Sequence, residues 1–230
     1  MPHYDYVLMD VDNTLLDFDG AEDAALRETL AFYGYPLTEE ALRAYHRVNR
    51  GLWDAFERGE INQNDILSRR FLGFMEAMGG DHDPIGMNRS YMDSLAQKGS
   101  LLPGAEAFCQ SLAPHCTLAI VTNGISAVQR GRLEACCLPS LFREIFISAE
   151  LGYQKPQREF FDTVFLKLGI EDPKRVVIFG DSLSSDIQGG IQAGIDTLWY
   201  NPKGLACGSI TPTFAVSSYE EARRLILGEE

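Results

Sequence analysis

The sequence lacks the features of several classes of metal-binding and secreted proteins. Its four histidines and five cysteines form neither a Cys-x-x-Cys motif nor a pair of histidines at metal-ligand spacing. We therefore expect no disulfide framework, no thiolate metal site and no histidine-based zinc site. The cysteines, which we expect to be reduced and mostly buried, are Cys109, Cys116, Cys136, Cys137 and Cys207.

Long apolar runs and positive charge are scarce as well. No apolar run approaches the length that spans a bilayer, and the first five residues lack the basic and apolar regions of a secretory signal, so we expect a cytoplasmic protein without a membrane partner. Acidic residues number 33 against 20 basic ones, which gives a formal net charge of −13. A field of this sign repels nucleic-acid polymers, whereas a small phosphorylated substrate needs only local positive charge at its site. The sequence does not indicate an oligomeric state.

The stretch from Tyr6 to Thr14 carries the first chemical signal. Four apolar residues, Tyr6 to Met9, predict a strand buried on both faces, as in a parallel sheet covered by helices. Asp10 and Asp12 follow it, and side chains two residues apart on extended backbone point to the same side. Two carboxylates so close together require a proton or a cation between them.

The rest of the chain separates into a helical part and an alternating part. We expect four helices over residues 17–98, at 21–33, from residue 39 with Thr38 as N-cap, at about 64–78 and at 84–97, inserted between residues 1–16 and 99–230. Beyond residue 104, strands alternate with helices, which is typical of a parallel sheet with helices on both faces. The expected strands are 117–121, 144–147, 175–179, 197–199 and 214–216. The expected helices are 105–112, 125–136, 158–168, 184–193 and 219–227, the last with a capping box of Ser217 and Glu220.

Polar residues follow these strands in a consistent way. The strand at 117–121 runs into Thr122-Asn123-Gly124, Lys155 lies in the loop after the strand at 144–147, and the strand at 175–179 runs into Gly180-Asp181 with Asp186 five residues on. In an open parallel sheet such loops converge on one crevice. The set combines carboxylates suited to Mg²⁺ with donors that can hold phosphoryl oxygens.

The four motifs together resemble those of the haloacid dehalogenase superfamily of phosphatases. They are Asp10-Val11-Asp12-Asn13-Thr14, Thr122-Asn123-Gly124, Lys155-Pro156 and Gly180-Asp181-Ser182-x-x-Ser185-Asp186. The resemblance covers nearly the whole chain and implies a Rossmann-like core, residues 1–16 and 99–230, with a helical cap at 17–98. Asp17-Phe18-Asp19 and the segments at 48–53 and 121–125 are most similar to the noncanonical pyrimidine 5′-nucleotidases.

The resemblance also implies a role for each motif. Asp10 would be the nucleophile that forms an aspartyl-phosphate, and Asp12 would protonate the leaving oxygen and then activate water. Mg²⁺ would be held by Asp10, the backbone carbonyl of Asp12 and Asp181, with Asp186 near the metal through water or orienting Lys155. Thr122, Asn123 and Lys155 would bind the phosphoryl oxygens.

Substrate selection is expected to lie in the helical part. Phe18, Asn49 and Trp53 are candidates to stack on or hydrogen-bond a nucleobase, and Tyr45 is a further aromatic that equally fits a bundle core. A pyrimidine nucleoside monophosphate is the expected substrate, with phosphoglycolate or a sugar phosphate as alternatives. A phosphomutase, a dehalogenase and a binding module without activity are the remaining alternatives, although a departing halide needs no acid such as Asp12.

Overall fold

The computed structural model describes residues 3–136 and 138–229. The chain divides into two compact units. The sheet unit comprises Met1–Asp17, Ser100–Ser126 and Cys136–Glu230, and the helical unit comprises Phe18–Gly99 and Ala127–Ala135. The assignment of these units as a catalytic core and a cap with the boundaries given above stays a prediction.

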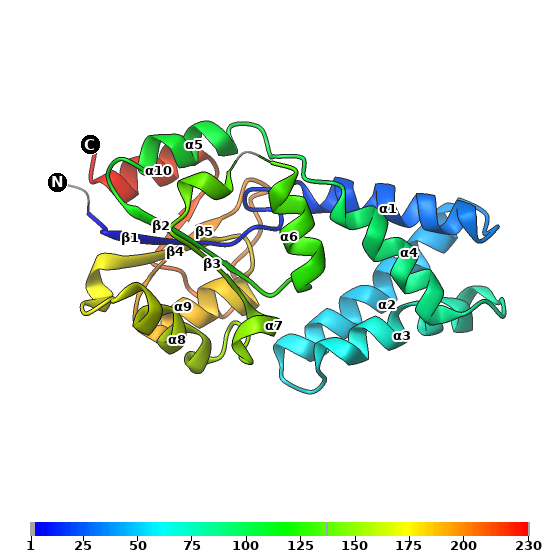
Figure 1. Cartoon of the computed structure of the whole chain (residues 1–230). Coiled ribbons are helices and arrows are strands. Elements are labelled where there is room, and N and C mark those ends of the chain that lie inside the picture. The colour runs from blue at the N-terminus through cyan, green and yellow to red at the C-terminus, as the bar shows by residue number, and fades with distance from the viewer. Residues whose placement is uncertain (1–2, 137, 230) are drawn as a thin grey trace. The chain divides into compact units, whose positions relative to one another are not determined.

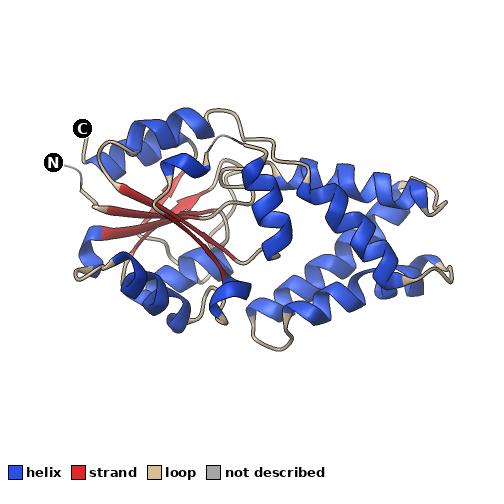
Figure 2. Cartoon of the chain, viewed as in Figure 1, coloured by secondary structure: helices blue, strands red, loops and turns tan. Residues whose placement is uncertain are grey.

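Within its described residues, the sheet unit is built on a six-stranded parallel sheet in the order β3-β2-β1-β4-β5-β6. The strands are β1 (Tyr6–Met9), β2 (Thr117–Thr122), β3 (Glu144–Ile147), β4 (Val176–Gly180), β5 (Asp196–Tyr200) and β6 (Phe214–Val216). The central strands are buried on both faces, because α5 (Ala105–Leu112) and α10 (Tyr219–Leu227) cover one side and α8 (Arg158–Leu168) and α9 (Gln188–Ala193) cover the other (Figures 1 and 2). The predicted Rossmann-like α/β fold is confirmed.

The helical unit contains the four predicted helices and most of a fifth. They are α1 (Phe18–Phe32), α2 (Glu39–Glu57), α3 (Gln63–Met78), α4 (Pro84–Ala96) and α6 (Ser126–Glu134). Thr38 caps α2 as predicted, since its side chain accepts a hydrogen bond from the backbone N–H of Ala41. The ring of Tyr45 is fully buried, with centroids 5.4 Å from Phe71 and 5.5 Å from Tyr91. Tyr45 therefore packs the bundle core.

The sheet register places the ends of three adjacent strands at one level. Met9 pairs with Ile120 of β2 on one side and with Phe179 of β4 on the other. The next residue, Asp10, continues this pattern, because its backbone N–H donates to the carbonyl of Phe179 over 3.0 Å. Side chains that follow β1, β2 and β4 are therefore delivered to the same edge of the sheet.

Several local predictions were wrong or incomplete. The N-cap of α10 is Ser218, which accepts from the N–H of Glu221, so the predicted capping box of Ser217 and Glu220 is wrong by one residue. The helix predicted at 184–193 is two elements, because a π-helical turn, η3 (Leu183–Ile187), precedes α9. Three short elements were not predicted, namely η1 (Pro139–Leu141), α7 (Ser148–Leu151) and η2 (Pro173–Arg175).

The described residues include four of the five cysteines. Cys109, Cys116 and Cys136 are buried and Cys207 is partly buried, whereas Cys137 lies outside the described residues. Among the helices of residues 3–136 and 138–229, none has the length and apolar character needed to cross a membrane.

Candidate active site

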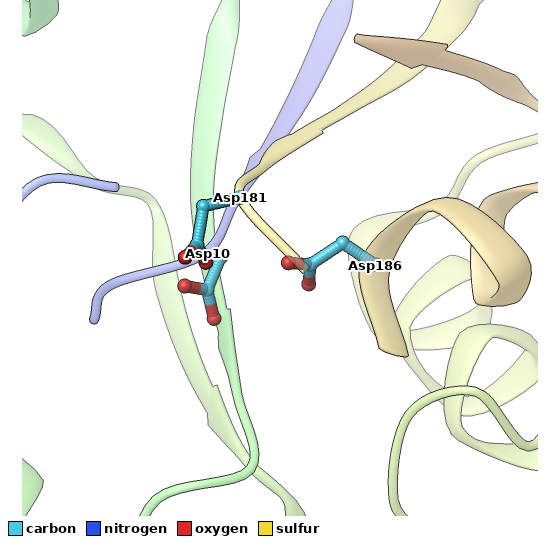
Figure 3. A group of neighbouring side chains, drawn as sticks. All are labelled: Asp10, Asp181 and Asp186. Atoms are coloured by element: carbon cyan, nitrogen blue, oxygen red, sulfur yellow. The ribbon is translucent and has the colours of Figure 1, made fainter. Parts of the chain in front are cut away.

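Three carboxylates converge at the carboxyl edge of the sheet. Asp10 follows β1, Asp181 follows β4, and Asp186 lies in the π-helical turn (Figure 3). Each offers an oxygen, and these three oxygens lie within 4.8 Å of one another. All three residues were predicted to lie at this edge of the sheet. In the sequence, Asp10 is more than 170 residues away from the other two.

The loop after Asp10 turns sharply back on itself. The carbonyl of Val11 accepts hydrogen bonds from the N–H groups of Thr14, Leu15 and Leu16. Asn13 adopts a left-handed conformation with φ of 57°, which Asn tolerates better than most residues. The turn thus reverses the chain within a few residues of the nucleophile candidate and holds the backbone around Asp12 in a closed loop.

Lys155 is the buried cation of the site. Its side chain is 1% exposed, and its ammonium donates to Asp10 Oδ1 at 2.7 Å, to Asp186 Oδ1 at 2.6 Å and to the carbonyl of Val121 at 2.8 Å. An ammonium has three donors, so all of them are satisfied. Lys155 is fixed in one orientation and compensates part of the negative charge around Asp10.

One lysine does not balance three clustered carboxylates. Burial raises the pKa of Asp10 to about 7, with Lys155 acting to lower it and the charges of Asp186 and Asp12 acting to raise it. Burial and the charges of Asp10 and Asp186 also raise the pKa of Asp181 well above its ordinary value. Burial alone would lower the pKa of Lys155, but Asp10 and Asp186 outweigh it and raise that pKa. The ammonium is therefore charged, and the carboxylates require a further cation to ionise together.

The donor set fits a magnesium ion. Mg²⁺ prefers oxygen ligands and is commonly held by one or two carboxylates together with substrate oxygens. Burial and neighbouring negative charges disfavour the ionised forms of Asp10 and Asp181. A divalent cation bound to both carboxylates would stabilise their ionised forms. Asp186 is committed elsewhere, since Oδ1 accepts from Lys155 and Oδ2 from the N–H of Ser182 at 3.1 Å. Its contacts favour the role of orienting Lys155.

The loop after β2 fastens Lys155 from its backbone side. The side-chain amide of Asn123 donates to the carbonyl of Lys155 at 2.8 Å and accepts from its N–H at 2.9 Å. Thr122, which is buried, accepts the N–H of Gly124 at its hydroxyl oxygen at 3.0 Å. Hydrogen bonds thus join two of the three predicted phosphate-binding residues, Asn123 and Lys155, and Thr122 directly precedes Asn123 at the end of β2.

Gly180 provides space for Asp186. A Cβ atom at position 180 would lie 2.3 Å from Asp186 Oδ2 and 2.4 Å from its Cγ, closer than any real contact. Only glycine at the end of β4 lets the Asp186 carboxylate approach the backbone this closely. Gly180 is part of the fourth motif found in the sequence, but its role was not predicted.

Asp12 lies apart from the three-carboxylate group. Its side chain is partly exposed, and its carboxylate is not among the oxygens that converge within 4.8 Å. The prediction placed only the backbone carbonyl of Asp12 on the metal and kept the carboxylate for proton transfer. That division of roles stays a prediction.

The three candidates in the helical unit have different surroundings. Asn49 is buried and its Nδ2 donates to Glu22 Oε1 at 2.7 Å, a carboxylate that the sequence did not single out. The ring of Phe18 is partly buried with the guanidinium of Arg132 5.4 Å from its centroid, and Trp53 is partly exposed. A carboxylate only accepts hydrogen bonds, so Glu22 fixes which way the Asn49 amide faces.

The fold and this arrangement of acids and lysine define a class of enzyme. The sequence matches the haloacid dehalogenase-like hydrolase family over residues 7–200, and the chain belongs to this family. It is therefore an enzyme of the hydrolase class, and the predicted family resemblance is confirmed.

The chain is similar to several individual members of this family over almost its full length. The chain is 37% identical over 220 residues to the pyrimidine 5′-nucleotidase PynA of Streptococcus pneumoniae, covering 95% of this chain and 93% of that protein. It is 33% identical to the pyrimidine 5′-nucleotidase YjjG of Escherichia coli, covering 97% and 98% of the two chains. A solved structure of Bacillus subtilis YfnB bound to magnesium is 36% identical, with a TM-score of 0.92 over 97% of this chain and 99% of that chain.

Proposed function

We propose that this protein is a magnesium-dependent phosphomonoesterase that acts through an aspartyl-phosphate on Asp10. The observation that carries this proposal is the convergence of Asp10, Asp181 and Asp186 around the fully bonded ammonium of Lys155. A carboxylate oxygen of Asp10 attacks phosphorus as the bond to the leaving alcohol oxygen breaks, and water then cleaves the acyl phosphate. Lys155 holds Asp10 Oδ1, which fixes the direction of the nucleophile.

Asp10 and Asp181 would hold the magnesium ion, together with the backbone carbonyl of Asp12. When bound, the ion reduces the repulsion between the Asp10 carboxylate and a phosphate dianion and polarises the phosphoryl group. The related YfnB structure is bound to magnesium, which supports the choice of this ion.

The carboxyl group of Asp12 supplies the proton chemistry in this proposal. In the first half-reaction it donates a proton to the leaving alkoxide oxygen, and in the second it accepts a proton from the attacking water. The two transfers balance, because the proton given to the leaving oxygen is replaced by one from the attacking water, and both need a carboxyl group that substrate and water can reach. The partial exposure of Asp12, in contrast to the burial of Asp10, is consistent with that role.

The phosphoryl oxygens would be held by the loops after β2 and α7. We assign Thr122 and Lys155 to direct contacts with these oxygens, for which the Lys155 ammonium would exchange one of its three protein acceptors for a phosphoryl oxygen. For Asn123 we favour action through Lys155, because its side-chain amide bonds both polar backbone groups of that lysine. The loop backbone then acts as the scaffold that keeps the ammonium in place.

For the substrate, we propose a pyrimidine nucleoside monophosphate. Two relatives that match almost the full chain are named pyrimidine 5′-nucleotidases. Glu22 holds the amide nitrogen of Asn49, so the carbonyl oxygen of Asn49 faces away from Glu22 as an acceptor suited to an N–H on a base edge. Phe18 precedes Glu22 by one helical turn and Trp53 follows Asn49 by one turn, and a base stacked on such an aromatic gains about 1–3 kcal/mol.

The proposal is tested first on chemistry and then on specificity. Hydrolysis of a generic aryl phosphate should require Mg²⁺, stop on chelation and be abolished in Asp10→Asn. The matched control is Asp162→Asn, an exposed aspartate on α8 paired with Arg158, which should keep normal turnover. Undiminished turnover of Asp10→Asn would remove the nucleophile assignment.

A substrate panel at fixed Mg²⁺ then separates the candidate substrates. Pyrimidine monophosphates should exceed purine monophosphates, phosphoglycolate and hexose phosphates in kcat/KM. If phosphoglycolate or a hexose phosphate ranks first, the nucleotidase proposal fails while the phosphatase chemistry stands. The cytoplasmic location expected from the sequence stays a prediction.

A further inference from the structure

Beyond the residues that face the proposed metal, the backbone of Asp181 is held by side chains from distant parts of the sheet unit. The N–H of Asp181 donates to the hydroxyl of Thr14 at 3.1 Å. The carbonyl of Asp181 accepts from the indole nitrogen of Trp199, on β5, at 2.8 Å. Asp181 lies just beyond the end of β4, where the ladder between β4 and β5 stops at Gly180 and Trp199. Beyond the last pair of the ladder, side chains instead of a neighbouring strand bind the backbone of Asp181.

These contacts fix both peptide planes that flank the Asp181 Cα. The plane before it is held through the N–H by Thr14. The plane after it is held twice, since Trp199 binds the carbonyl of Asp181 and Asp186 Oδ2 accepts the N–H of Ser182 at 3.1 Å. Peptide planes are rigid, so holding both of them fixes φ and ψ at Asp181 and with them the direction of its Cα–Cβ bond. Only the side-chain torsions remain adjustable.

Both anchors are themselves buried and braced. Thr14 is fully buried, and its carbonyl accepts a hydrogen bond from the hydroxyl of Tyr219 at 2.8 Å. The ring of Tyr219 is stacked between Phe108 and Tyr200, with centroids 5.0 Å away on each side. Trp199 is 3% exposed within the sheet. Movement of either anchor would disturb packed aromatic groups, so the restraint on Asp181 is stiff.

A stiff restraint is needed because the neighbours of Asp181 repel it. One oxygen of its carboxylate lies within 4.8 Å of a carboxylate oxygen of Asp10 and of one of Asp186. Like charges at this distance favour a rotation of the loop that carries Asp181 away from the other two. If the ligand has to be reoriented when the ion binds, the free-energy cost of reorientation lowers the affinity for the ion.

We propose that Trp199 is a positioning residue for the metal-binding carboxylate of Asp181, acting with Thr14 through the two peptide planes of Asp181. The inference rests on the proposed magnesium site. Neither residue touches the ion in this scheme, and each acts only through the backbone of Asp181. Loss of either hydrogen bond should weaken Mg²⁺ binding by about tenfold, the lower end of the effect of groups that orient metal ligands.

The experiment measures Mg²⁺ binding directly by calorimetry on the full chain, without substrate. Trp199→Phe removes the indole N–H and keeps an aromatic ring, and Thr14→Val removes the hydroxyl and keeps the shape. The matched control is Tyr4→Phe, which deletes another buried aromatic donor, bonded to Asp196 Oδ2 at 2.9 Å, at the opposite end of β1. Trp199→Phe and Thr14→Val should each bind Mg²⁺ about tenfold more weakly, whereas Tyr4→Phe should bind it as the wild type does.

Turnover provides a second readout that a general loss of structure would not produce. In Trp199→Phe the Mg²⁺ concentration for half-maximal activity should rise about tenfold, and saturating Mg²⁺ should restore most of the turnover. If Trp199→Phe does not fold, Thr14→Val alone decides, because it releases the other peptide plane of the same residue.

The outcomes separate this inference from the proposed function. Wild-type affinity for Mg²⁺ in both variants, or an equal loss in Tyr4→Phe, would overturn the positioning role and leave the phosphatase proposal intact. A wild-type protein that binds no Mg²⁺ and needs none for turnover would overturn the proposed metal and this inference together.

Discussion

The raised pKa of Asp10 makes a quantitative prediction about stability in the absence of metal. The pKa of Asp10 is about 7 in the folded protein, against an ordinary value of 3.8 for an aspartate. The charged form is therefore disfavoured by folding. Below the ordinary pKa the group is protonated in both states and contributes no penalty. As the pH rises toward 7, the unfolded chain loses this proton while the folded protein keeps it, so the stability falls.

The size of the effect follows from the difference in pKa. A difference of about 3 units corresponds to a full penalty of about 4 kcal/mol once the pH exceeds both values. Between pH 5 and pH 7, where the protein can be handled easily, about 2 kcal/mol of that penalty should develop. Mg²⁺ favours the ionised carboxylate, so saturating Mg²⁺ should flatten this part of the pH dependence.

Urea denaturation of the wild type and Asp10→Asn at pH 5, 6 and 7 in a chelator tests the prediction. The difference between the two proteins reports the titration of Asp10 together with its effect on Asp181, because the asparagine does not titrate and the charge of Asp10 raises the pKa of Asp181. Relative to Asp10→Asn, the wild type should lose about 2 kcal/mol of unfolding free energy between pH 5 and pH 7. Parallel pH profiles for the two proteins would show that Asp10 is ionised throughout and would refute the electrostatic reasoning.

Two further predictions concern residues around Asp10. Asp12→Asn should lower turnover by about 10²–10⁴-fold for alkyl phosphates and much less for an aryl phosphate, whose leaving group departs without a proton. Steady-state kinetics on both substrates test this, and equal losses would contradict the role of Asp12 as an acid. Gly180→Ala should force Asp186 away from Lys155, lowering turnover at least tenfold and the unfolding free energy by about 1–3 kcal/mol. Gly51→Ala is its control, because the new methyl group in α2 meets no atom within 4 Å and should stabilise the protein.

The sequence was sufficient to predict the parts of the fold that depend on local pattern. The apolar run from Tyr6 to Met9 and the turn residues after each strand predicted β1, the parallel sheet and the polar strand ends. Thr38 predicted the start of α2 because an N-cap is a short-range interaction. The capping box at α10 was misplaced because Ser217 and Ser218 are equivalent in local pattern, and only the strand end at Val216 decides between them.

The partners of the site residues could not be predicted in the same way. The bond between Asn123 and Lys155 joins residues 32 apart, and the bond from Trp199 to Asp181 spans 18 residues across two strands. Nothing in the local sequence of Trp199 distinguishes a core aromatic from one that orients a neighbouring loop. The same ambiguity applied to the candidates on α2, where Tyr45 packs the core while Asn49 bonds to Glu22. Such roles follow from tertiary contacts alone.

In the proposed mechanism, the charge balance at the sheet edge connects metal binding with the ionisation of Asp10. Three carboxylates within 4.8 Å face one ammonium, and the ammonium has no donor left for a second bond to Asp10. Burial, together with the neighbouring negative charges, raises the pKa values of Asp10 and Asp181, so near neutral pH the protein without metal keeps part of Asp10 protonated. A protonated carboxyl group is a poor nucleophile. The cation that the site needs for charge balance is thus also what would ionise Asp10, and a second positive group from the protein in place of the metal would remove that control over reactivity.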